Sequence, residues 1–90
     1  MSMRDRFYTI VKYPVITEKS VLMLEKQNKV TLIVDRKSNK STVKKVIEEK
    51  FDVKVKKVNM LITPKGEKKA IVTFYTKDDA IKVATALGIL

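Results

Sequence analysis

The chain has 90 residues, a formal net charge of +10, and neither cysteine nor histidine. Ninety residues suffice for one domain with a small core, so we expect residues 1–90 to form a single domain. Without Cys and His the chain lacks disulfides, thiolate metal sites, the usual nucleophile and the usual base near neutral pH, so we expect neither an enzyme nor a cofactor.

The first third of the chain predicts a strand, a helix and a second strand. Phe7 to Tyr13 has strand character and is closed by Pro14, which cannot donate a hydrogen bond to a central ladder. Thr17 is a suitable N-cap for a helix from about Glu18 to Lys26. Apolar residues then alternate from Val30 to Asp35, with the period of two that indicates a strand.

A second helix and a third strand are expected next. After a polar connection over residues 36–40, an apolar stripe recurs at helical spacing, at Val43, Val46, Ile47 and Phe51. Lys56 to Thr63 predicts a strand. Because the apolar positions change parity just before it, we expect a bulge near Lys56 and Lys57.

The end of the chain predicts a hairpin and a last helix. Pro64 to Lys68 forms the turn into a strand from Lys69 to Tyr75, and a helix follows from about Asp78 to Leu87, with Gly88 as its left-handed stop. The expected fold class is therefore α+β. It is a β-α-β-α-β-β-α sandwich, with a mostly antiparallel four-stranded sheet and helices packed on both of its faces.

Two adjacent acidic pairs are the nearest approach to a catalytic arrangement. Neighbours on a helix point about 100° apart, so neither Asp78 with Asp79 nor Glu48 with Glu49 converges on one substrate. We interpret Asp78 and Asp79 as favouring a helix start. We expect Glu48 and Glu49 to pair with Lys44 and Lys45.

The positive charge is concentrated in one stretch. Between Arg36 and Lys69 there are twelve basic and four acidic residues, a net charge of +8, which leaves only +2 for the rest of the chain. A lysine-rich surface that keeps the protein soluble would have the same composition. The concentration favours a binding site for a polyanion, with nucleic acid as the leading candidate.

Three clusters suit RNA, and the first two also have a purely structural interpretation. Tyr13 could stack on an unpaired base beside Lys12, or be a half-buried strand residue. The stretch from Ser38 to Thr42 could hold a phosphate, or simply cap a helix. Lysines around the bulge and the hairpin offer phosphate contacts with little means of reading bases. The residues expected to contact RNA are Lys12, Tyr13, Lys19, Asn39, Lys40, Lys54, Lys56, Lys57, Lys65, Lys68 and Lys69.

The expected location is the cytoplasm. The longest apolar run, Val21 to Leu24, is far too short to cross a bilayer, so we expect no membrane insertion. The first residues lack the apolar stretch and the cleavage site of a signal peptide.

Several stretches of the chain resemble one family in order and spacing. They are Lys12 to Lys19, Asn39 and Lys40, Phe51 to Val55, Val58 to Leu61, and Lys68 to Thr73. Together they resemble the universal large-subunit ribosomal protein L-twenty-three family. Because the turn at Pro64 to Lys68 is short, the resemblance is to the archaeal and eukaryotic type rather than to bacterial members with a long basic hairpin.

That resemblance implies a structural protein of the large ribosomal subunit. Such a protein binds ribosomal RNA near the exit of the nascent-peptide tunnel, beside neighbouring ribosomal proteins, and is a monomer outside the ribosome. The family's docking surface for the signal recognition particle or nascent-chain chaperones includes an acidic residue that corresponds to Glu18. From the residues alone, Glu18 need only favour the helix dipole.

Two other functions are compatible with the same basic stretch. A free-standing RNA- or DNA-binding regulator would select a short sequence motif. An adaptor for an acidic protein would bind RNA weakly, and charge reversal at Lys54, Lys56 and Lys57 would not change that binding.

Overall fold

The structure, a computed structural model, describes residues 3–90, with side chains from residue 6 onward. The described residues form four helices and four strands. In chain order they are α1 (Met3–Ile10), β1 (Val11–Pro14), α2 (Glu18–Gln27), β2 (Lys29–Val34), α3 (Lys40–Phe51), β3 (Val55–Ile62), β4 (Lys68–Phe74) and α4 (Lys77–Ala86).

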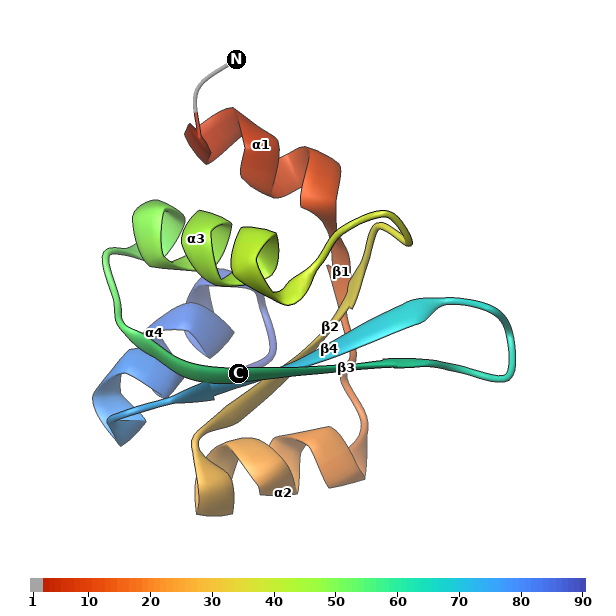
Figure 1. Cartoon of the computed structure of the whole chain (residues 1–90). Coiled ribbons are helices and arrows are strands. Elements are labelled where there is room, and N and C mark those ends of the chain that lie inside the picture. The colour runs from red at the N-terminus through yellow and green to blue at the C-terminus, as the bar shows by residue number, and fades with distance from the viewer. Residues whose placement is uncertain (1–2) are drawn as a thin grey trace.

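The four strands form one antiparallel sheet in the order β1-β2-β4-β3. α3 packs against β3, α2 against β2, and α4 against β2 and β4. Figure 1 shows α3 and α2 on opposite sides of the sheet, with α1 next to α3. The expected α+β class, with four antiparallel strands and helices packed on the sheet, is confirmed.

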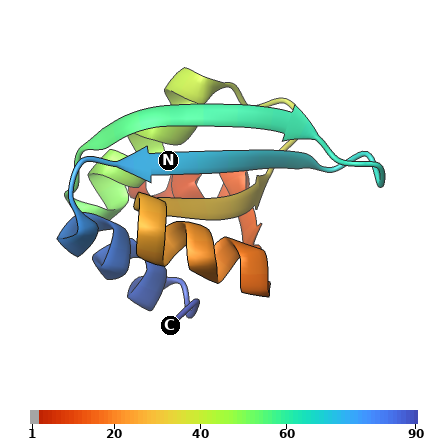
Figure 2. The ribbon, with the colours of Figure 1, turned by 90° about the horizontal axis from the view of Figure 1, so that it is seen from below.

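The two faces of the sheet differ in composition. One face carries the core: Val30, Leu32 and Val34 of β2 lie beside Ala70, Val72 and Phe74 of β4, and all of them are buried. The opposite face carries the alternate residues of the same strands, among them Ile33, Lys69 and Ile71. Seen from below, no described helix crosses in front of β3 and β4 (Figure 2). The sheet therefore keeps part of this second face open, and we call it the open face.

The first strand is shorter than its sequence predicts. We expected a strand from Phe7, but residues 3–10 form α1 and β1 begins only at Val11. The reason lies in the spacing of the apolar residues. Phe7, Ile10 and Val11 are buried, at positions i, i+3 and i+4, whereas Tyr8 and Thr9 are exposed. That is the pattern of an amphipathic helix, not the alternation of a strand.

α1 is held to α3 by aromatic and cationic contacts. The Phe7 and Phe51 rings meet edge to face with their centroids 5.3 Å apart. The Lys50 ammonium lies 4.6 Å from the centroid of the Tyr8 ring and donates a 2.9 Å hydrogen bond to the Tyr8 hydroxyl. An edge-to-face aromatic pair and a cation over a ring each add to the apolar burial.

The predicted helix starts are confirmed by their caps. Thr17 caps α2 through a 3.1 Å hydrogen bond from the Ser20 backbone N–H, and the Ser20 hydroxyl accepts in return from the Thr17 N–H. Asn39 caps α3, where its side-chain oxygen accepts from the Thr42 N–H at 2.8 Å. Each cap satisfies a donor that the first helical turn would otherwise leave unpaired.

The predicted bulge and hairpin are also present. The register of β3 on β4 shifts between Val55 and Lys57, so the irregularity falls at Lys56. The turn after β3 contains Gly66 at a φ of 83°, which a residue without a Cβ adopts at little cost. Gly88 ends the last helix at a φ of 77°, as expected. Among the described helices, none is long and apolar enough to span a membrane.

We predict that Phe7→Ala lowers the free energy of unfolding by about 3 to 5 kcal/mol, because it empties a buried aromatic site between α1 and α3. Denaturant unfolding at 25 °C measures the change. The matched control is Tyr75→Ala, which removes an exposed aromatic ring outside α1 and should cost less than about 1 kcal/mol. Equal small effects of both substitutions would contradict the packing of α1 described above.

Candidate nucleic-acid interface

A row of side chains crosses the open face where β1, β2 and β4 run side by side. Tyr13 pairs with Ile33, and Ile33 pairs with Lys69, so the three residues are direct cross-strand neighbours. Directly paired residues in a sheet have Cβ atoms about 5 Å apart. The pairing order therefore brings an aromatic ring, an apolar side chain and an ammonium group into one line, although they come from distant parts of the sequence.

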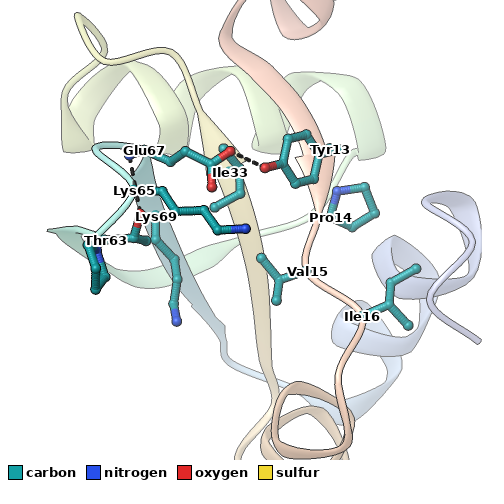
Figure 3. A pocket seen from close by; sticks show the side chains of 10 residues that line it. Tyr13, Pro14, Val15, Ile16, Ile33, Thr63, Lys65, Glu67 and Lys69 are labelled. Atoms are coloured by element: carbon teal, nitrogen blue, oxygen red, sulfur yellow. Dashed lines mark hydrogen bonds between the residues drawn. The ribbon is translucent and has the colours of Figure 1, made fainter.

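A groove of about 450 Å³ opens above this row. Tyr13, Pro14 and Val15 line one side, Ile33 forms the floor, and Lys65, Glu67 and Lys69 line the hairpin side (Figure 3). Ile33 is 4% exposed, whereas Tyr13 is 46% exposed. The groove therefore has an apolar floor and a charged rim.

The hairpin turn holds Glu67 at the rim. The Thr63 N–H donates to the Glu67 carbonyl at 2.8 Å, the Glu67 N–H donates to the Thr63 hydroxyl at 3.2 Å, and the Gly66 N–H donates to the Thr63 carbonyl at 2.8 Å. The Glu67 carboxylate in turn accepts a hydrogen bond from the Tyr13 hydroxyl. This bond joins β1 to the hairpin across the groove.

The same contact raises the pKa of Tyr13. The hydrogen bond to Glu67 is the main cause, and desolvation and the negative charge of Glu67 act in the same direction. Each of them favours the neutral phenol, which can donate, over the phenolate, which cannot. Any contribution of the Tyr13–Glu67 hydrogen bond to stability is thus present at neutral pH. It is lost as the pH rises through the pKa of Tyr13 in the folded state.

A smaller hollow lies next to the groove, between α2 and the open face. Its lining includes Lys19 of α2, Thr31 of β2, and Lys69 and Ile71 of β4. Lys69 borders both hollows. The structure thus brings together four of the predicted residues, Tyr13, Lys19, Lys65 and Lys69, around adjoining parts of one surface.

Two other predicted residues have structural partners. The Lys68 ammonium donates to the Ser38 carbonyl at 2.7 Å and to the Arg36 carbonyl at 3.3 Å, which ties the base of the hairpin to the connection before α3. An ammonium group has three donors, so one remains. Asn39 is the N-cap of α3, and its side-chain oxygen also accepts from the Thr42 hydroxyl at 2.9 Å. Exposed Lys40 follows it.

A second group of lysines lies at the far end of β3. Lys54, Lys56 and Lys57 are exposed at the bulge and the turn before it. Lys57 and Ile62 are five residues apart on β3, about 17 Å at the rise of a strand, and Lys65 lies beyond Ile62 in the turn. These lysines therefore form a site separate from the groove. Lys12 is exposed on edge strand β1.

Glu18 lies exposed in the first turn of α2, as its predicted role requires. Glu67 and Ile33 were not among the predicted site residues. Glu67 is separated from Tyr13 by 54 residues, and nothing local in the sequence indicates that they meet. No group of three or more potential metal ligands occurs among the described side chains.

We predict that Glu67→Gln lowers the pKa of Tyr13 toward its ordinary value, since the substitution removes both the carboxylate acceptor and its charge. An NMR pH titration of the three tyrosine rings measures the shift. The ring signals of Tyr8 and Tyr75, which do not line the groove, serve as internal references. A Tyr13 titration identical in both proteins would contradict the described hydrogen bond.

Comparison with known proteins identifies the family of this chain. Residues 9–86 match the family profile described as "Ribosomal protein L23". The chain is 44% identical over 82 residues to the "Large ribosomal subunit protein uL23" of Methanococcus aeolicus, an alignment that spans 91% of this chain and 95% of the relative. It is 46% identical over 81 residues to the protein of the same name from Pyrobaculum aerophilum, over 90% of this chain and all of the relative. The chain therefore belongs to the ribosomal protein L23 family, whose members are structural proteins rather than enzymes.

Proposed function

We propose that this chain is a structural constituent of the large ribosomal subunit, in which it binds ribosomal RNA as a single domain. The observation that carries the proposal is the set of exposed lysines at the β3 bulge, together with exposed Lys65 and half-buried Lys68 and Lys69 around the hairpin. Family membership supports it, and so do the names of two relatives, each a large ribosomal subunit protein.

Neutralisation of phosphate is the proposed mechanism. Lys54, Lys56 and Lys57 extend from a short irregular segment and can follow an RNA backbone without reading its bases. Lys12, Lys19, Lys40, Lys65 and Lys69 add contacts from neighbouring elements. Asn39 and Lys68 contribute mainly by shaping the surface, because the Asn39 side-chain oxygen and two of the three Lys68 donors already have partners within the protein.

We predict that replacing Lys54, Lys56 and Lys57 together by Gln weakens binding to a large-subunit ribosomal RNA fragment. It should also reduce the slope of log K against log salt by about 2 to 3, since each phosphate contact contributes about 0.7 to 0.9. Filter binding at several salt concentrations measures both effects.

The matched control carries the same charge change elsewhere, with Lys26, Lys77 and Lys82 replaced by Gln on the exposed surfaces of α2 and α4. It should change the slope by less than about 1. Equal losses in the two triple variants would mean that net charge alone determines binding, and would contradict a defined RNA-binding surface.

The proposed place in the subunit is the exit of the nascent-peptide tunnel, in ribosomes of the cytoplasm. Glu18 supports a role in docking of targeting factors or nascent-chain chaperones, because its carboxylate is exposed in the first turn of α2 on a chain of net charge +10. An exposed negative charge on a basic protein is an electrostatic feature that a basic partner can recognise.

We predict that large subunits carrying Glu18→Lys bind the signal recognition particle more slowly, with the difference greatest at low salt. Association rates measured by stopped-flow fluorescence test this. Glu25→Lys, at another exposed position of α2, is the matched control and should leave the rate unchanged. An unchanged rate with Glu18→Lys would remove Glu18 from the docking surface without affecting the RNA-binding proposal.

A further inference from the structure

The groove between β1 and the hairpin has a composition that ordinary phosphate contacts do not require. Its floor is the buried Ile33, its wall includes the half-exposed Tyr13 ring, and a carboxylate lies at the rim beside two lysines. A carboxylate repels a phosphate, so a surface that served the RNA backbone alone would gain from a neutral or basic residue at this position. The Glu67 carboxylate accepts from the Tyr13 hydroxyl, and its remaining acceptor sites suit a ligand that also presents hydrogen-bond donors.

We propose that this groove binds one unpaired guanine nucleotide of the ribosomal RNA, with the base stacked on the exposed Tyr13 ring and its donor edge on Glu67. The proposal deepens the RNA-binding function proposed above and rests on it. A groove of about 450 Å³ lies within the size range of pockets for small ligands, about 300 to 1,000 Å³.

Each part of a nucleotide has a counterpart in the groove. A base has an apolar face that stacks on an aromatic ring, and the exposed Tyr13 ring offers such a surface. The attached phosphate meets the ammonium groups of Lys65 and Lys69, which line the groove on the hairpin side. The excess of lysine over acid in the whole chain favours a polyanion over an acidic peptide of low charge.

Glu67 selects among the bases through the direction of its hydrogen bonds. An ionised carboxylate only accepts, and its two oxygens provide about four acceptor sites, so it can keep the Tyr13 hydroxyl and accept further donors. Guanine offers two adjacent donors on its Watson–Crick edge. Cytosine and adenine offer one amino group each, and uracil offers one N–H between two oxygens that the carboxylate would repel. The base must be unpaired, because duplex RNA does not expose this edge to a side chain.

The test uses the full chain and four single-stranded pentanucleotides, UUGUU, UUAUU, UUCUU and UUUUU. Two-dimensional NMR of the backbone amides gives both the affinity and the place of binding. We expect UUGUU to bind at least about fivefold more tightly than UUUUU and to shift the amides of Tyr13, Ile33 and Lys69. With Glu67→Gln the guanine preference should disappear, while binding of UUUUU is kept or strengthened.

Three variants separate a site from a change in fold or charge. Glu25→Gln removes one carboxylate from the exposed surface of α2 and should keep the guanine preference. Tyr13→Phe keeps the ring and should keep stacking, whereas Tyr13→Ala should weaken binding of all four pentanucleotides by about fivefold or more. Thermal unfolding checks that each variant is folded.

Two results would overturn the proposal. One is equal affinity for the four pentanucleotides, with or without amide shifts at the groove. The other is that the amides of the groove do not shift when RNA is added but do shift when an acidic peptide is added. That result would make the groove a protein-docking site. In both cases the salt-dependent binding of ribosomal RNA by Lys54, Lys56 and Lys57 would still be observed if the proposed function is right. Failure of the guanine-site proposal can therefore be distinguished from failure of the proposed RNA-binding function.

Discussion

The pairing of β2 on both of its edges is the constraint on which the rest of the structure depends. Because β1 and β4 flank it, residues 30–34 are all buried, including those on the face opposite the core. A strand paired on both edges cannot shift by one residue without moving every apolar side chain to the wrong face. Its register therefore fixes the row of Tyr13, Ile33 and Lys69, and with it the groove.

Electrostatics distinguishes the two surfaces that this sheet organises. A net charge of +10 on 90 residues disfavours the compact state through self-repulsion, and a bound polyanion relieves that repulsion. The lysines at the β3 bulge are exposed, and the nearby Glu48 carboxylate is occupied by the Val55 N–H, so these lysines suit a phosphate backbone. Around the groove, Glu67 accompanies Lys65 and Lys69. The lysines at the β3 bulge are suited to affinity for an RNA backbone, and the groove is suited to selection among bases.

Much of the fold could be predicted because its signals are local. The Thr17 cap, the apolar stripe of α3 and the parity change before Lys56 each lie within a few residues, and each is confirmed. Residues 7–10 were wrongly expected to belong to the first strand, because the prediction gave weight to the apolar character of the segment and not to the helical spacing of Phe7, Ile10 and Val11.

The site was less predictable because it depends on pairing between distant segments. Lys68 and Lys69 are neighbours with identical chemistry, yet they lie on opposite faces of β4. Lys68 donates to backbone carbonyls in the connection before α3, whereas Lys69 borders the groove. The contact of Tyr13 with Glu67 depends on the strand order, which places β1 and the hairpin on either side of β2. No local pattern encodes these relations.

The central claim is that this surface recognises ribosomal RNA and not merely negative charge. The most direct measurement is chemical footprinting of complete large-subunit ribosomal RNA with the purified chain, in the presence of an excess of unrelated structured RNA as competitor. We expect protection of one contiguous region that persists in the competitor. Protection scattered along the RNA, or protection that the competitor abolishes, would contradict the claim.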